Sequence, residues 1–73
     1  MIRIDRDATL YDIVTDHPDI KDIMFDLGFK EIIMPGMLTT AGRFMTIEKG
    51  AKSKNIDWTI IEEAFRNHGY VID

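Results

Sequence analysis

The chain has 73 residues, no cysteine and a formal net charge of −4, with 45% hydrophobic and 30% charged residues. This composition predicts one small folded domain, residues 1–73, and excludes disulfides and thiolate chemistry. The negative charge disfavours nucleic-acid binding, and without a signal peptide or an apolar run near ~20 residues we expect a cytoplasmic protein outside the membrane.

The first half of the chain predicts two short helices. Thr9 is suited to cap the first helix, which must end before Pro18 because proline disfavours helical geometry in the residue that precedes it. Residues 18–27 predict the second helix, since their apolar side chains recur at i, i+3, i+4 and i+7. Gly28 is placed to end that helix.

The second half predicts one helical turn at residues 30–34 and then three short helices. The first carries Ala41, Phe44 and Met45, the second covers residues 47–54, and the last ends at Gly69. Each has a residue suited to cap its N-terminus: Thr39 or Thr40, then Thr46, then Asp57.

These elements predict an all-α fold of about five short helices. Helices of ten residues or fewer are marginal in water, so packing must hold them together. The two ends of the chain alternate apolar and polar residues, which is compatible with a minimal pairing of the termini. In that pairing Tyr70 and Ile72 would lie beside Ile2 and Ile4.

The spacing of caps and apolar residues resembles a small all-helical family of domains of unknown function. The resemblance rests on "TLYDIVTDHPDIKDIMFDLGF" and "KGAKSKNIDWTIIEEAF" and covers nearly the whole chain. Many members of that family carry a Cys-x-x-Cys pair after the glycine that matches Gly28. This chain has "FKEIIMPGMLTTAGRFM" there, so it is similar to the cysteine-free branch, and no redox role, metal or cofactor carries over.

Domains of that family occur in front of di-iron hemerythrin-like domains in iron–sulfur cluster repair proteins. The cysteine-free branch occurs alone or at the N-terminus of larger proteins with hemerythrin-like or PAS modules. The resemblance therefore implies a helical fold and a neighbouring domain of that kind as a partner. It implies no activity, because the family has none established.

The sequence offers no convincing catalytic or metal site. His17 and His68 are too few for a zinc site without cysteine, and Ser53 has no nearby base. The carboxylates of residues 16–26 fall mostly on the polar face of a helix, whereas paired acids for acid–base catalysis need burial. We therefore expect a protein that is not an enzyme and has no metal or cofactor.

Residues 29–46 hold three of the five methionines around a Pro-Gly pair. Methionines fill gaps in cores and also form adaptable binding surfaces, so both readings are open. Five short helices cannot easily bury all of these apolar side chains. Our hypothesis is that residues 33–45, hereafter the Met-rich segment, dock onto another copy, as in a homodimer, or onto a neighbouring domain. The predicted partner-binding residues are Ile33, Met34, Pro35, Met37, Leu38, Phe44 and Met45.

Two alternatives use polar residues of the same region. The free N–H groups of the helix expected after Thr40 could hold an anion or carboxylate ligand over an apolar pocket floored by Met37 and Phe44. The predicted ligand-binding residues are Gly36, Thr39, Thr40 and Arg43. Residues 30–56 also carry five bases and two acids, but so few bases do not outweigh the negative net charge. A nucleic-acid binder that uses Arg43, Lys49, Lys52 and Lys54 is therefore the weakest of the hypotheses, and we expect no nucleic-acid partner.

Overall fold

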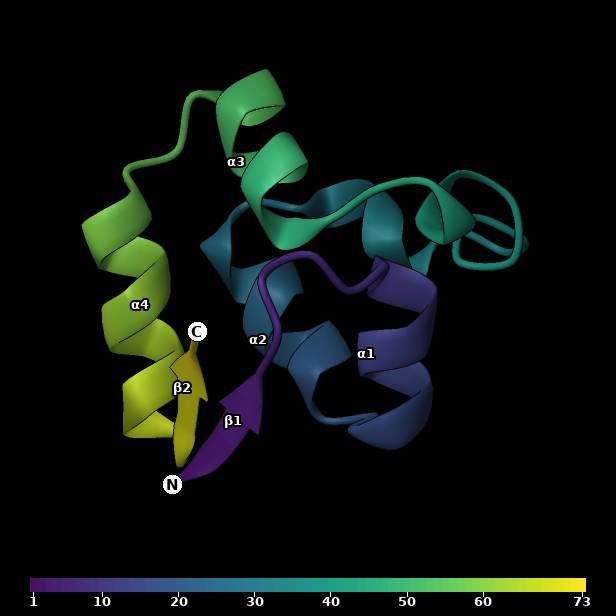
Figure 1. Cartoon of the computed structure of the whole chain (residues 1–73). Coiled ribbons are helices and arrows are strands. Elements are labelled where there is room, and N and C mark those ends of the chain that lie inside the picture. Colours follow the sequence, from purple (N-terminus) through teal and green to yellow (C-terminus); the bar gives the residue numbers. More distant parts are fainter.

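The computed structural model describes all residues, 1–73, and combines helices with a small sheet (Figure 1). Four α-helices, two short 3-10 helices (η) and two strands follow one another along the chain. Their bounds are β1 Ile2–Ile4, α1 Leu10–Asp16, α2 Ile20–Leu27, η1 Lys30–Ile33, η2 Ala41–Arg43, α3 Ile47–Lys54, α4 Trp58–Asn67 and β2 Tyr70–Ile72.

The predicted all-α fold class is wrong, because β1 and β2 form a two-stranded parallel sheet and the domain mixes helices and strands. Ile2 pairs with Tyr70 and Ile4 with Ile72, as the alternating ends suggested. The pairing is part of the core, since Ile4, Tyr70 and Ile72 are all buried. Short strands at opposite ends of a chain gain their hydrogen bonds only after the helices bring them together, so local sequence underestimates them.

The predicted helix caps are mostly confirmed. Three side chains each accept a hydrogen bond from a backbone N–H in the first turn of a helix: Thr9 from Asp12 at 3.2 Å, Thr46 from Lys49 at 3.1 Å, and Asp57 from Thr59 at 2.8 Å. Gly28 ends α2 with a φ of 120°, a conformation that glycine adopts without steric cost.

The start of α2 differs from the prediction, because the helix begins at Ile20 rather than at Pro18. Asp19 occupies the cap position but makes no capping hydrogen bond. Its carboxylate instead accepts the hydroxyl proton of Tyr70, with O–O distances of 2.7 and 2.9 Å. The ring of His17 lies edge-on to Tyr70, with 5.2 Å between ring centroids. A tertiary contact with β2 therefore replaces the local cap.

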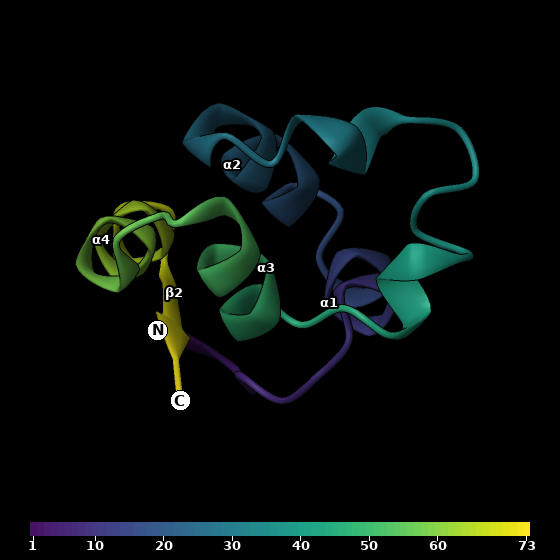
Figure 2. The same ribbon diagram turned by 90° about the horizontal axis from the view of Figure 1, so that it is seen from above.

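One core of fifteen buried apolar side chains joins every element except η2. Ile20, Ile47, Ile61 and Phe65 are fully enclosed in it. Two views show α4 and the strand pair at one end of the molecule and the Met-rich segment at the opposite end (Figures 1 and 2). Both chain termini lie at the end with the strands. None of the helices is both long enough and apolar enough to span a membrane.

Candidate functional site

The Met-rich segment forms a compact series of turns rather than the expected helix. The N–H of Met37 donates to the carbonyl of Met34 at 3.1 Å, and the N–H of Gly42 donates to the carbonyl of Met37 at 2.8 Å. Gly36 has a φ of 80°, which the turn after Pro35 requires. Apart from Ile33, which ends η1, the only helical part is the three-residue η2.

The segment is divided between the core and the solvent. Ile33, Met34 and Phe44 are 52%, 58% and 78% exposed, whereas neighbouring Ile32 is fully buried because η1 turns it inward. The other predicted partner-binding residues comprise exposed Pro35 and partly buried Met37, Leu38 and Met45, which pack against the core. Three of the six large apolar side chains exposed on the molecule thus belong to this segment; the others are Met1, Ile2 and Ile60.

The Met-rich segment contributes to the lining of an apolar pocket of about 250 Å³. Its apolar lining consists of Leu10, Phe29, Ile32, Met37, Ala41 and Met45. Gly50 of α3 also lines it, and a Cβ atom there would lie 2.9 Å from Cε1 of Phe29. Since real Cβ atoms essentially never come this close, the glycine lets the helix lie directly against the ring. The Met-rich segment therefore borders a concave apolar surface.

The pocket also has a polar side, made by Glu31, Ser53 and Lys54. Lys54 forms an ion pair with Oε1 of Glu31. The hydrogen bond from Lys54 lowers the pKa of Glu31 below its usual range. A carboxylate and an ammonium group consequently stand beside an otherwise apolar surface.

The predicted anion-binding residues do not form the arrangement we expected. The hydroxyl groups of Thr39 and Thr40 both donate to the carbonyl of Gly36, at 3.1 and 2.7 Å, so neither caps a helix. Arg43 donates from Nε to the carbonyl of Thr39 at 2.9 Å. The hypothesis depended on the free N–H groups of a short helix after Thr40, but only a three-residue 3-10 helix forms there.

Arg43 and Phe44 also differ from the expected ligand pocket. The guanidinium carbon of Arg43 lies 4.1 Å from the ring centroid of Tyr11, and Arg43 forms no ion pair. Phe44 points to solvent and cannot floor a pocket, whereas Met37 does line one. The structure thus separates Arg43 from the pocket that holds Met37.

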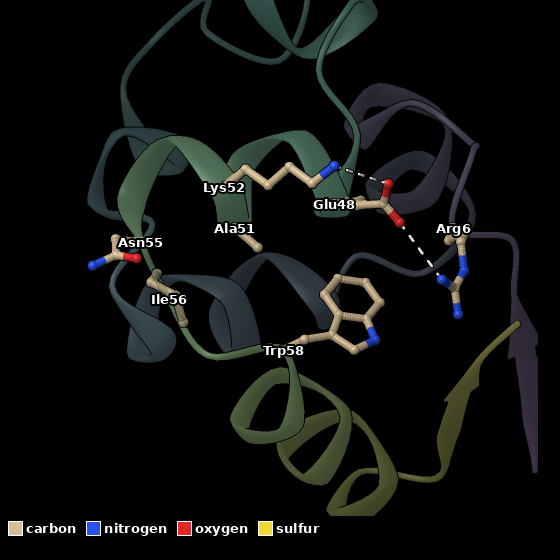
Figure 3. Close-up of a pocket in the computed structure, with 7 residues that line it drawn as sticks. All are labelled: Arg6, Glu48, Ala51, Lys52, Asn55, Ile56 and Trp58. Atoms are coloured by element: carbon tan, nitrogen blue, oxygen red, sulfur yellow. Dashed lines mark ion pairs between the residues drawn. The ribbon is translucent and has the colours of Figure 1, made fainter.

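A second cavity, of about 420 Å³, lies between α3 and the start of α4 (Figure 3). The guanidinium of Arg6 is 5.4 Å from the ring centroid of Trp58 and forms a 3.5 Å ion pair with Glu48. Lys52 also pairs with Glu48, at 3.7 Å. The cations that line this cavity are therefore both paired with one carboxylate. No group of three His, Asp or Glu side chains on the molecule is arranged to hold a metal ion.

A family model places the chain among known proteins. The model is described as Domain of unknown function (DUF1858) and matches residues 4–73. The chain belongs to this family. The predicted family of domains of unknown function is thus confirmed. No curated protein matches this DUF1858 domain.

A solved structure shares the fold of this DUF1858 domain. It is the crystal structure of the conserved domain protein from Streptococcus pneumoniae TIGR4, with 27% sequence identity and a TM-score of 0.91. The likeness covers 100% of this chain and 92% of that chain. The arrangement of helices and strands therefore recurs in another conserved domain.

Sequence reasoning placed Met37 in an apolar pocket, but it missed the rest of that lining and the whole second cavity of this DUF1858 domain. Residues far apart in the chain line each one, such as Arg6 with Trp58 and Leu10 with Gly50. One local signal did exist for the apolar pocket. A glycine inside a helix is destabilising by roughly 0.5–1 kcal/mol relative to alanine, so Gly50 indicated a close approach of another group.

Proposed function

We propose that this DUF1858 domain is a non-catalytic interaction module that self-associates through the Met-rich segment. The supporting observation is that Ile33, Met34 and Phe44 stay exposed in a segment that also lines an apolar pocket, in a chain that encloses fifteen other apolar side chains. Several exposed apolar side chains in one short segment favour a binding site, and methionine suits a surface that adapts to its partner.

The size of the surface bears on the strength of binding. A standard interface buries about 800 Å² on each partner, which is about a fifth of the 4525 Å² that this chain exposes. Three exposed side chains do not supply that area alone. The contact must also use the partly buried Met37, Leu38 and Met45. We therefore expect a weak, reversible homodimer.

A neighbouring hemerythrin-like or PAS-type domain is the other partner we propose for this surface. In that arrangement the chain would act as a cytoplasmic sensory accessory module, related to the N-terminal domains of iron–sulfur cluster repair proteins. This proposal rests on the sequence resemblance. Both chain termini lie away from the Met-rich segment (Figure 1), so a domain joined at either end would need a linker to reach it, which favours a second copy as the partner.

The remaining hypotheses have less support. Arg43 has no carboxylate partner and is free to bind an anion, but the hydroxyl protons of Thr39 and Thr40 are donated to the backbone. Two of the three lysines considered for nucleic-acid binding, Lys52 and Lys54, are in ion pairs. Binding of an anion or carboxylate therefore remains the alternative proposal, and we expect no binding of nucleic acid.

A matched pair of variants tests self-association. Ile33 and Ile60 are 52% and 54% exposed, but only Ile33 belongs to the Met-rich segment. We expect Ile33→Glu to shift the monomer–dimer equilibrium toward monomer in sedimentation velocity and Ile60→Glu to leave it unchanged. A wild-type chain that stays monomeric to millimolar concentration, or two variants with equal effects, would refute the proposed function.

A further inference from the structure

We infer that Phe44 of one copy inserts into the apolar pocket of a second copy, and that Arg43 beside it pairs with Glu31 on the polar side of that pocket. This inference rests on the proposed self-association and specifies how the two copies fit together. The two-fold exchange would make each copy donate one aromatic ring and receive one.

The exposure and backbone of Phe44 suit a side chain that enters a pocket on a second copy. It is 78% exposed, more than any other large apolar side chain of the molecule. Its backbone is nevertheless held in place, because its N–H donates to the carbonyl of Ala41 at 3.1 Å and the N–H of Met45 donates to the same carbonyl at 3.0 Å. An aromatic ring on a fixed backbone has two χ angles to immobilise, so its burial costs little conformational entropy.

The pocket is large enough to receive the ring. An apolar cavity of roughly 150 Å³ in another protein binds benzene, and this pocket has about 250 Å³. Its apolar lining comes from α1, η1, η2 and the residues beside them, while Gly50 contributes no side chain. A phenyl ring would therefore replace solvent on an apolar surface without displacing a buried group.

The donor and the receptor are close together in the chain. Ala41 and Met45 line the pocket, and Phe44 stands between them in the sequence. In a two-fold contact the same patch of each copy meets its counterpart, so a feature and its complement must both lie on that patch. A two-fold axis between Phe44 and the pocket satisfies this condition for both copies at once.

The charges beside the ring and the pocket are complementary. Arg43 forms no ion pair within its own chain. Glu31 uses Oε1 for Lys54, and its Oε2 has no side-chain partner. The planar guanidinium of arginine binds carboxylate oxygens well, and opposite charges across a contact fix its register. This arrangement favours a second copy over a partner whose matching face is basic.

Three single variants and one double variant test the inference by sedimentation velocity. Phe44→Ala removes the ring, and Ala41→Leu places bulk at the pocket from an exposed position. We expect each of these two variants to raise the dissociation constant of the dimer at least tenfold, while the melting temperature of the chain changes by no more than a few degrees. Arg43→Glu should also weaken the dimer, and the double variant Arg43→Glu with Glu31→Arg should recover most of the lost affinity.

An isotope-filtered NMR experiment observes the contact directly. In a mixture of labelled and unlabelled chains, we expect intermolecular NOEs from the Phe44 ring to the methyl groups of Leu10 and Ile32. If Ile33→Glu abolishes the dimer but Phe44→Ala leaves it intact, self-association stands and this pairing is refuted. NOEs from Phe44 to other groups would refute it as well. A chain that stays monomeric would refute both the self-association and the pairing of Phe44 with the pocket.

Discussion

The strand pair gives the sharpest test of how the fold is held together. Ile4 and Ile2 lie on the same strand and pair with Ile72 and Tyr70, but Ile4 is 3% exposed and Ile2 is 50% exposed. Replacing either by alanine changes strand propensity equally. Only Ile4→Ala removes a side chain from the core.

The expected magnitudes differ clearly. Truncating a buried isoleucine to alanine costs about 2–5 kcal/mol, whereas a half-exposed one should cost about 1 kcal/mol or less. A domain of 73 residues has a free energy of unfolding of roughly 4–11 kcal/mol, so Ile4→Ala would remove a large fraction of it. A loss of about 3 kcal/mol corresponds to a fall of roughly 12–24 °C in melting temperature.

Urea unfolding followed by circular dichroism measures both variants under the same conditions. We expect the midpoint for Ile4→Ala to fall well below that for Ile2→Ala, with similar slopes. Equal midpoints would show that the strand pair is peripheral and that the helices alone make the core. The reasoning about the fold would then be wrong.

Three further predictions concern caps and titration. Thr46→Ala should lower the free energy of unfolding by about 1 kcal/mol in the same urea assay, because it removes the cap of α3, and an unchanged midpoint would contradict this. The hydrogen bond to Asp19 and burial raise the pKa of Tyr70 in the folded chain. The stability that Tyr70 contributes is therefore present below pH 10 and is lost as pH rises through its folded-state pKa. Tyr70→Phe should lack that alkaline loss. The pKa of Glu31 is lower in the folded chain than in the unfolded chain, so Glu31 stabilises the fold above pH 4.5, and this stability is lost as pH falls through the folded-state pKa. Lys54→Gln should reduce this loss of stability in acid.

Local signals in the sequence predicted most of the helices. The cap of α3 at Thr46 and the glycine that ends α2 depend on neighbours within a few residues, and both are confirmed. The start of α2 was wrong because Asp19 bonds to Tyr70, which lies far along the chain. The fold class was wrong for a similar reason, since the strands pair only in the folded molecule.

The candidate site was predictable only in part. A segment with so many apolar residues indicated a surface, and the exposure of Phe44 agrees with that expectation. The sequence did not indicate which residues would face solvent, because a single 3-10 turn buries Ile32 and exposes Ile33. It also did not reveal the apolar pocket, whose lining comes from elements on both sides of the Met-rich segment, including Gly50.

The central claim is that the Met-rich segment is a binding surface between copies, and an NMR dilution series tests it most directly. Backbone amide spectra of the wild-type chain would be recorded from micromolar to millimolar concentration. We expect concentration-dependent shifts at residues 33–45 and at the pocket, with α4 and the strand pair unchanged. Spectra that do not change with concentration, or shifts centred on α4, would contradict the account.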